Sequence, residues 1–294
     1  MNAAGLTHGS FDRRAVMRSF DRAAPSYEAG AQLQRRVRTE LLERLGYFSL
    51  RPQTVLDLGS GTCRGTLALR RRYPRAQVIA IDIAPAMLRA APHALWPWRG
   101  FRRVCAEAQT LPLREHSVEL IFSNLMLQWC AEPERVFREL ARVLKPGGVL
   151  LFSSFGPATL QELRAAWASV DAGEHVMPFP DLPQLGDALT HAGLLEPVLD
   201  IEQHQLSYPD VYALMRSLKH IGAGNAAARR ARTLTGRARM QRMIEAYAQQ
   251  RTAAGVPATY EVVFGAAFGS AATDSADAPS EFAVPLSSIR RAPR

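Results

Sequence analysis

The stretch Val55–Thr66, VLDLGSGTCRGT, decides the fold of this chain. It continues a short apolar run that starts at Thr54, a pattern typical of a buried strand. Glycines follow at Gly59, Gly61 and Gly65. Glycines at such a point let the backbone turn tightly and come close to a nucleotide. We therefore predict a strand over Thr54–Leu58 that ends in a nucleotide-binding loop.

The spacing of these glycines argues against two common nucleotide sites. No Gly-Lys-Ser/Thr follows, as a P-loop requires, and the spacing G-x-G-x-x-x-G differs from the dinucleotide fingerprint G-x-G-x-x-G. Asp57 would also repel a pyrophosphate by several kcal/mol. S-adenosylmethionine has no phosphate and carries an ammonium and a sulfonium, so Asp57 favours that cofactor. The alternative is that Asp57 only caps the helix after the loop.

Cys63 stands where a third close glycine is expected. A cysteine with an ordinary negative φ fits such a loop, whereas a requirement for positive φ would cost about 1 kcal/mol. We expect a Cys63→Gly change to leave activity similar or to tighten cofactor binding.

Short β-branched runs alternate with helical patterns through the middle of the chain, which predicts parallel βαβ units and an α/β fold. The predicted strands are Thr54–Leu58, Gln77–Asp82, Phe101–Ala106, Val118–Ser123, Val149–Phe155, Val198–Leu206 and Thr259–Phe268. The predicted helices are Arg13–Gly46 with a break at Pro25, Thr66–Arg72, Pro85–Ala91, Pro133–Val143, Leu160–Trp167, Leu185–Ala192, Val211–Ile221 and Met240–Arg251.

Acidic residues end two of these strands. Asp82 ends the second, where a carboxylate can accept hydrogen bonds from both hydroxyls of a ribose; the alternative is a solvated turn residue. Glu107 ends the third, where it could accept from the exocyclic amine of adenine; the alternative is a surface glutamate. We also expect Ile83, Met87 and Ala108 to belong to the cofactor site.

The composition is that of a globular protein, with 294 residues, 47% hydrophobic and 21% charged. The net charge is +9, although Lys145 and Lys219 are the only lysines. This charge indicates either an acidic partner or an arginine bias from a GC-rich genome. Basic runs interleaved with aromatics are absent, so we expect no nucleic-acid partner. No apolar run predicts a membrane span.

Taken together, several motifs resemble the class I S-adenosylmethionine-dependent methyltransferases. They are DLGSGT at Asp57–Thr62, Asp82, AEAQTLPL at Ala106–Leu113 and LKPGG at Leu144–Gly148. The resemblance implies a Rossmann-like sheet of seven strands with helices on both faces, an antiparallel final hairpin and S-adenosylmethionine as methyl donor. The cofactor-binding residues that it implies in the loop are Asp57, Gly59, Ser60 and Gly61.

Longer stretches are similar to the malonyl-[acyl-carrier protein] O-methyltransferase family of biotin synthesis. They are FDRAAPSYEAGAQLQ at Phe20–Gln34, FSNLMLQWC at Phe122–Cys130, SSFGPATLQELRAAW at Ser153–Trp167, LMRSLKHIGAGN at Leu214–Asn225 and ATYEVVFGAAF at Ala258–Phe268. This resemblance implies methylation of the free carboxylate of a malonyl thioester, which masks its charge and primes synthesis of a pimeloyl precursor.

Residues within these stretches are our candidates for the reaction. The catalytic candidates are Tyr27, Gln128, Trp129 and Lys219, and Gln34 and Asn124 are assigned to the cofactor. An ionised malonyl carboxylate needs no general base, so alignment and a water-poor site would carry the rate. The alternatives are core packing for Trp129, a helix–helix contact for Tyr27 and a solvated helix face for Lys219.

Arginines cluster between the last two predicted strands, at Arg229, Arg230, Arg232, Arg237, Arg239 and Arg242. Acyl carrier proteins are acidic, so we predict a docking surface that steers association electrostatically. The alternative is a solvated helical face.

The predicted organisation is an N-terminal helical lid over 1–48, a methyltransferase domain over 49–269 with a helical insert at about 207–257, and a disordered tail over 270–294. The cysteines and histidines lack metal-ligand spacing, so we predict no metal site. Free thiols and no signal-peptide core indicate the cytoplasm. Two other functions stay open: methylation of another carboxylate or a protein side chain, and a non-catalytic role in protein assembly.

Overall fold

The computed structural model describes residues 12–91, 100–223 and 236–270. Its helices are α1 (Arg13–Ala23), α2 (Tyr27–Gly30), α3 (Gln32–Arg44), η1 (Leu45–Tyr47), α4 (Arg64–Arg72), α5 (Pro85–Arg89), η3 (Leu127–Trp129), α6 (Pro133–Val143), α7 (Gln161–Ala168), α8 (Leu182–His191), α9 (Val211–His220) and α10 (Arg237–Ala248). Its strands are β1 (Thr54–Leu58), β2 (Gln77–Asp82), β3 (Arg102–Cys105), β4 (Val118–Asn124), β5 (Leu144–Phe155), β6 (Leu195–Tyr208) and β7 (Val256–Phe268). None of the described helices is long and apolar enough to cross a membrane.

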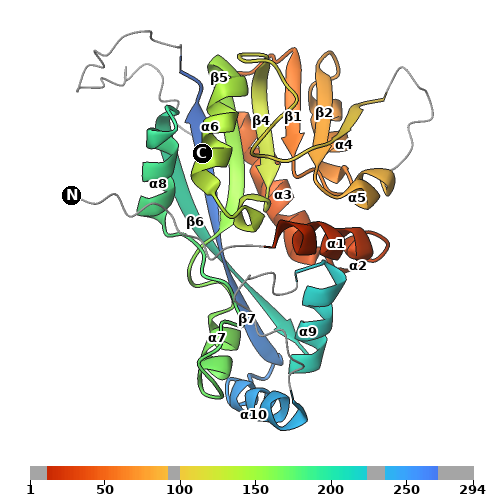
Figure 1. The fold of residues 1–294 in the computed structure, drawn as a ribbon, viewed down its shortest axis with the longest axis vertical. Coiled ribbons are helices and arrows are strands. Elements are labelled where there is room, and N and C mark those ends of the chain that lie inside the picture. The colour runs from red at the N-terminus through yellow and green to blue at the C-terminus, as the bar shows by residue number, and fades with distance from the viewer. Residues whose placement is uncertain (1–11, 92–99, 224–235, 271–294) are drawn as a thin grey trace.

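The strands form one seven-stranded sheet in the order β3-β2-β1-β4-β5-β7-β6 (Figure 1). The first five are parallel, and β7 runs antiparallel to both β5 and β6. The predicted Rossmann-like sheet with an antiparallel final hairpin is therefore confirmed. The strand order reverses between β1 and β4, and in open α/β sheets ligands bind beyond the carboxyl ends of the strands at such a switch point.

Helices cover both faces of the sheet because successive strand residues point to opposite sides. Val55 of β1 packs in the core with α3 and α4, whereas Leu56 packs in the core with α6 and α8. By the same alternation Asp57 points toward α3 and α4. The sheet residue that looked most functional in the sequence therefore faces a buried helix layer.

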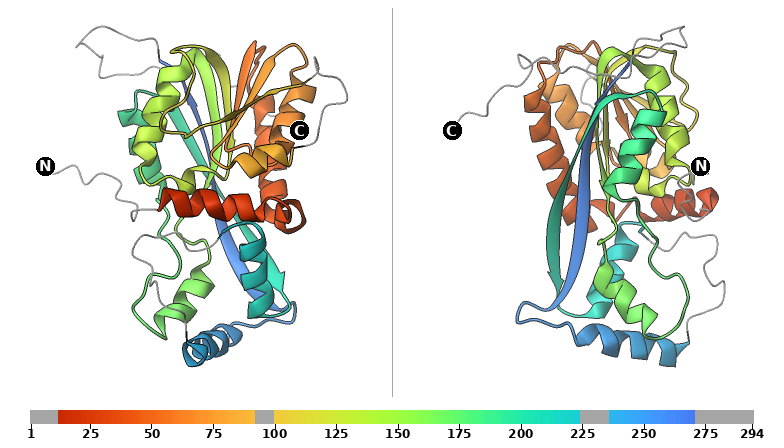
Figure 2. Two further views of the ribbon diagram at one scale, coloured as in Figure 1. Left: turned by 45° about the vertical axis from the view of Figure 1, so that its right-hand side comes forward. Right: turned by 90° about the vertical axis from the view of Figure 1, so that its left-hand side faces the viewer.

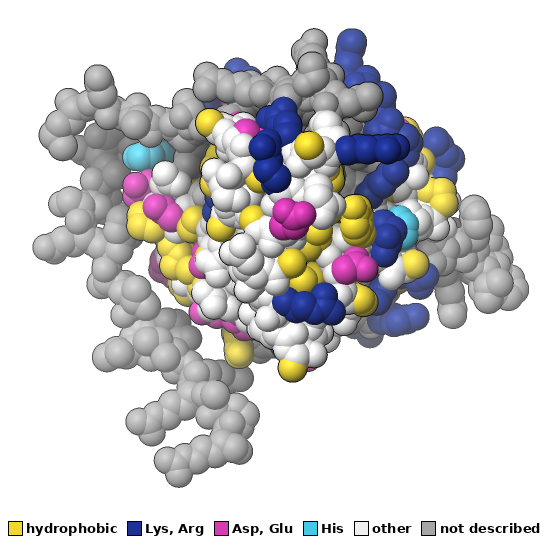
Figure 3. All heavy atoms as spheres, turned by 90° about the horizontal axis from the view of Figure 1, so that it is seen from below, with side chains coloured by type: hydrophobic (Ala, Val, Ile, Leu, Met, Phe, Trp, Pro, Cys, Tyr) yellow, Lys and Arg dark blue, Asp and Glu magenta, His cyan; other side chains and the backbone are white. Residues whose placement is uncertain are grey.

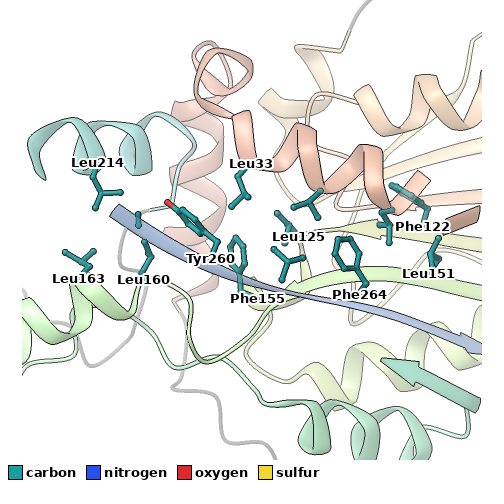
Figure 4. Close-up of a cluster of buried hydrophobic side chains, with 14 of the residues drawn as sticks. Leu33, Phe122, Leu125, Leu151, Phe155, Leu160, Leu163, Leu214, Tyr260 and Phe264 are labelled. Carbon is teal, nitrogen blue, oxygen red and sulfur yellow. The ribbon is translucent and has the colours of Figure 1, made fainter. Parts of the chain in front are cut away.

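The long strands β6 and β7 run beyond the rest of the sheet, and α7, α9 and α10 gather around that extension (Figures 1 and 2). One core joins the two parts. Figure 4 shows this cluster running from Phe122, Leu151 and Phe264 in the sheet to Leu160, Leu163 and Leu214 in the extension.

Several element boundaries differ from the prediction by a few residues, and two of the differences bear on the motifs. β5 begins at Leu144, not at Val149, because the LKPGG segment pairs with Val118 and Gly269. β3 ends at Cys105, so Glu107 lies beyond the strand. The helical break at Pro25 is confirmed, since α1 ends at Ala23 and α2 begins at Tyr27. The predicted disordered tail, apart from Ser270, lies outside the described residues.

Candidate active site

The glycine loop joins β1 to α4 at the switch point. Gly59 has φ 69°, and a Cβ there would stand 2.3 Å from Met126 Cγ, so only glycine fits. Gly61 has φ 53°, and a Cβ there would meet no atom within 4 Å. The backbone N–H groups of Gly59 and Ser60 donate to the Ile81 carbonyl at 2.8 and 3.0 Å. The loop is thus fixed against β2 while Gly61 stands beside open space.

Cys63 adopts φ 60° and ψ 24°, the left-handed conformation, directly before α4. Of the two possibilities left open by the sequence, the loop therefore takes the positive φ, at a cost of about 1 kcal/mol for a non-glycine residue. The thiol is fully buried against Ala80, Leu88 and Ala91. Burial raises its pKa to about 11, so this thiol is packed and unreactive.

Asp57 is 2% exposed and lies beneath the loop. Thr66 Oγ1 donates to Asp57 Oδ2 at 2.5 Å, and a Cβ on Gly65 would stand 3.1 Å from that oxygen. Burial is the main cause that raises the pKa of Asp57 to about 7. These contacts match the alternative role of Asp57, in which it caps the helix after the loop. A contact between Asp57 and a cofactor stays a prediction.

Asp82 is held at the carboxyl end of β2. Its Oδ2 accepts from the Gly61 N–H and its Oδ1 from the Ala84 N–H, each at 2.8 Å. Burial raises the pKa of Asp82. Each carboxylate oxygen keeps a lone pair beyond these bonds, so Asp82 can still accept from a ribose. Ile83 beside it is half-buried.

The remaining predicted cofactor residues divide between two environments. Met87 of α5 is buried and packs against Tyr27 of the lid. Glu107 forms an ion pair with Arg13 of α1, so its carboxylate faces the lid. Ala108 is partly buried against the α6–α8 side of the core.

The helices before β1 are fastened to the cofactor side by contacts that the sequence did not reveal. Thr62 Oγ1 of the glycine loop donates to Glu28 of α2, and Arg64 Nε lies 3.7 Å from the same carboxylate. The Ala86 N–H donates to Asp21 at 2.8 Å. Sequence reasoning missed Glu28 and Asp21, although both stand in or beside conspicuous helical segments, because their partners lie on distant segments.

A cavity of about 1120 Å³ lies between these N-terminal helices, η3 and the helices of the β6–β7 extension. The predicted residues that line it are Tyr27, Gln34, Gln128, Trp129 and Lys219. All four catalytic candidates therefore line the same cavity. The glycine-loop residues and Asp82 do not line it, so the cavity stands beside the predicted cofactor site.

Two glutamines at this boundary have free acceptors. The Oε1 atoms of Gln34 and Gln128 are buried and find no hydrogen-bond partner in the described part of the chain. Gln128 Nε2 donates to the Leu125 carbonyl at 2.6 Å, and Asn124 Nδ2 donates to the Gln34 carbonyl at 3.2 Å. Buried acceptors without a donor are costly, which suits a site that receives a ligand with donor groups.

The aromatic candidates are held by packing. Trp129 is half-buried. Its ring packs edge-on against the ring of Phe20, with the two ring centroids 5.2 Å apart. Tyr27 packs in a small cluster with Ala24 and Met87. Burial raises the pKa of Tyr27, so its hydroxyl stays protonated and able to donate. Lys219 is exposed at the cavity rim.

Among the described residues, one cluster has the side chains of a metal site: Glu40, Glu202 and His204. Glu202 already pairs with Arg44, and His204 Nε2 lies 3.4 Å from Glu40 Oε2. None of the three lines the cavity. We assign no role in the reaction to this cluster.

The comparisons with known proteins agree with the geometry. The family described as Methyltransferase domain matches residues 56–152. The YcgJ protein of Bacillus subtilis shares the fold, with TM-score 0.55 and 17% identity over 79% of this chain and 98% of that one.

Two curated relatives are much more similar, and both are named malonyl-[acyl-carrier protein] O-methyltransferase. The one from Methylovorus sp. (strain MP688) is 47% identical over 87% of this chain and 89% of its own length. The one from Halorhodospira halophila (strain DSM 244 / SL1) is 46% identical over 96% and 97%. The chain therefore belongs to the malonyl-[acyl-carrier protein] O-methyltransferase family.

Proposed function

We propose that this protein transfers a methyl group from S-adenosylmethionine to the free carboxylate of malonyl-[acyl-carrier protein]. The product is the malonyl methyl ester, which primes pimeloyl synthesis for biotin. The observation that carries the proposal is the cavity of about 1120 Å³, which gathers Tyr27, Gln128, Trp129 and Lys219 beside the glycine loop. Ligand pockets usually measure roughly 300–1,000 Å³, so this one has room for an acyl group together with the arm that carries it.

The cofactor side fits S-adenosylmethionine by the chemistry of its donors and acceptors. Asp82 offers acceptors to two ribose hydroxyls, Gly61 leaves space beside them, and the free Oε1 of Gln34 suits an ammonium donor. S-adenosylmethionine has no phosphate group, so the site needs no phosphate-binding loop. We propose that α1–α3 act as the lid over this site and that Ile83, Met87, Glu107, Ala108 and Asn124 complete it.

When bound, S-adenosylmethionine supplies a methyl carbon whose bond to the positive sulfur breaks as a carboxylate oxygen bonds to it. The electron pair stays on sulfur, and no proton moves. The chain therefore has to align two groups and exclude water. Gln128 Oε1 is an acceptor, so it suits the polarised methyl C–H groups better than the malonyl carboxylate.

The malonyl carboxylate needs donors or cations instead. Tyr27 can donate, because its raised pKa keeps the hydroxyl protonated. Lys219 of α9 lines the same cavity and can balance the charge of the carboxylate or of the arm. We assign the alignment of the carboxylate to Tyr27 and charge compensation to Lys219.

An acidic carrier protein fits the charge at the end of the molecule where α9 and α10 lie. Arg216 and Lys219 of α9 and Arg237 and Arg242 of α10 are exposed there. Figure 3 views this end, where dark-blue basic side chains alternate with fewer magenta acidic ones. Arg229, Arg230 and Arg232 of the predicted docking surface lie outside the described residues. The three free cysteines suit a reducing cytoplasm.

The decisive experiment combines the protein with S-adenosylmethionine and malonyl-[acyl-carrier protein] and measures the mass of the carrier. The expected result is a gain of one CH₂ mass, located on the malonyl group by fragmentation. An unchanged carrier would reject the proposal. Binding of S-adenosylhomocysteine without any product would favour another acceptor, and no binding at all would favour a non-catalytic role in assembly.

A further inference from the structure

A histidine at the lower end of the cavity is built into a fixed position. The ring of His175 stacks on Trp167 of α7, with centroids 3.7 Å apart and planes inclined by 8°. His175 Nε2 lies 2.8 Å from Asp171 Oδ1. Because a carboxylate only accepts, Nε2 carries the proton in this bond. Packing and hydrogen bonding together hold the ring in one orientation.

The support behind this ring extends to a second element. Asp171 Oδ1 also accepts from the Gly173 N–H at 2.8 Å, and its Oδ2 pairs with Arg239 of α10. The hydrogen bond from His175 is the largest cause that lowers the pKa of Asp171 to about 2. The carboxylate therefore stays ionised at any physiological pH and keeps the ring oriented.

The other ring nitrogen is available to a ligand. Within residues 12–91, 100–223 and 236–270, Nδ1 of His175 has no hydrogen-bond partner, and the His175 side chain is 21% exposed. Residues shared by the main cavity and a neighbouring cavity of about 420 Å³ form the wall between the two: Trp167, Gly173, Glu174, His175, Val176 and Phe179. His175 thus belongs to a wall that also contains Glu174 and the apolar side chains of Trp167, Val176 and Phe179.

This wall lies away from the methyl-transfer end. Tyr27 belongs to the lid and Gln128 to η3, whereas Trp167 and Arg239 belong to α7 and α10, which lie below α1 in every view (Figures 1 and 2). A malonyl group held at Tyr27 occupies only the upper part of such a cavity. The lower part has to receive what is attached to the thioester sulfur, which is a flexible chain with two amides, a hydroxyl and a phosphodiester.

We propose that His175, oriented by Asp171 and Trp167, binds a polar group of the phosphopantetheine arm beyond the amide nearest the sulfur and so positions the thioester for methyl transfer. The inference rests on the proposed function and names a residue for its acceptor side. A neutral imidazole accepts at Nδ1 from an amide N–H or hydroxyl, and a protonated one donates to a carbonyl or phosphate oxygen. Either form recognises the arm, and neither takes part in the bond that forms.

The test compares two acceptors that share the malonyl thioester but differ in the arm. Malonyl-coenzyme A carries the whole arm, and the malonyl thioester of N-acetylcysteamine keeps only the first amide. We expect His175→Gln to lower kcat/KM for malonyl-coenzyme A about tenfold more than for the short thioester, mainly through KM, as for a lost ligand hydrogen bond. Asp171→Asn, which keeps the size of the side chain, should shift the same ratio in the same direction.

The matched control is His191→Gln on exposed α8, away from the cavity. It should leave the ratio of the two acceptors at the wild-type value, and all variants should bind S-adenosylhomocysteine like the wild type. Equal losses with both acceptors would show a structural role or a carboxylate clamp, and no loss with either would remove His175 from recognition; each result overturns the inference. A wild-type protein that methylates neither thioester would instead overturn the proposed function itself.

Discussion

Tyr27 shows how a single side chain can combine packing with chemistry. Its ring packs in the cluster that joins α2 to Met87 of α5, and the residue lines the cavity of about 1120 Å³. Burial raises its pKa, so the hydroxyl is a donor at every pH where the protein works. The role of the ring in packing and the role of the hydroxyl as a donor can therefore be tested separately by substitution.

Replacing Tyr27 by Phe keeps the ring and removes the donor. We expect kcat to fall by about tenfold or more, because one hydrogen bond to the acceptor carboxylate is lost, while the Kd for S-adenosylhomocysteine stays within about twofold. Steady-state kinetics and calorimetry measure the two effects. Wild-type turnover in this variant would remove Tyr27 from the mechanism.

Cys63 carries a conformation that glycine adopts without cost. Alanine at this position keeps the positive φ and loses the buried sulfur, whereas glycine loses the sulfur and relieves the strain. We expect Cys63→Gly to be more stable than Cys63→Ala by about 1 kcal/mol, the reverse of the usual order in helices. Urea unfolding of the two variants measures the difference, and an Ala variant as stable as the Gly variant would contradict a strained loop.

Asp57 has two possible roles that pH separates. Its pKa is raised to about 7 in the protein without ligand, and the ammonium group of a ligand beside it would lower that pKa. Binding then releases a proton, so affinity for S-adenosylhomocysteine should rise between about pH 6 and pH 8 and level off above.

The control for this pH dependence is Asp57→Asn, which cannot ionise but can still accept from Thr66. Calorimetry at several pH values should show a smaller slope for this variant than for the wild type. Because the ligand titrates in the same way in both proteins, equal slopes would mean that Asp57 only supports the start of α4.

Among the elements, the N-terminal helices that we propose to act as a lid make polar contacts with three parts of the molecule. Glu28 holds the glycine loop, Asp21 holds the start of α5, and Ser19 and Ser26 donate to carbonyls at the end of α9 at 3.0 and 3.1 Å. These bonds join segments that lie far apart in the sequence. If these helices act as the proposed lid, breaking these few contacts should release them without unfolding the sheet.

Replacing Glu28 by Ala removes the acceptor for Thr62 and the ion pair with Arg64. We expect the Kd for S-adenosylhomocysteine to rise by about three- to tenfold and amide exchange in α1 and α2 to become faster, with little change in the unfolding of the sheet. Hydrogen-exchange mass spectrometry and calorimetry measure these effects. Glu43→Ala, on an exposed part of α3, is the control, and identical exchange in both variants would contradict this anchoring.

In the molecule as a whole, the net charge is +9, and the fold places several of the basic side chains at one end. The exposed Arg216, Lys219, Arg237 and Arg242 lie on α9 and α10, two of the helices that line the cavity, where we propose that an acidic carrier docks. Charges placed there act on association over a distance set by the Debye length, about 10 Å at 0.1 M salt.

We expect kcat/KM for malonyl-[acyl-carrier protein] to fall several-fold when salt rises from about 0.05 to 0.3 M, while values for the small N-acetylcysteamine thioester change little. Arg242→Glu on α10 should reproduce the loss at low salt, and Arg71→Glu on α4 should not. Kinetics that ignore ionic strength would contradict electrostatic docking.

Local sequence patterns were enough to predict the order of the elements, the sheet class and the position of the glycine loop. These features depend on local patterns: strand and helix periods, glycines after a strand, and Asp82 at a strand end. Motif spacing also pointed correctly to the family. The four catalytic candidates came from those motifs, and the fold brings all four to one cavity.

Only the tertiary structure decided which side chains meet. Asp57 faces Thr66 under the loop because strand alternation points it at the helix layer, and Cys63 takes a positive φ because the loop must turn into α4. The contacts Glu28–Thr62 and His175–Asp171–Arg239 depend on how distant segments pack. Local sequence patterns carry no such information, because contacts between distant segments follow from the packing of the whole chain around one core.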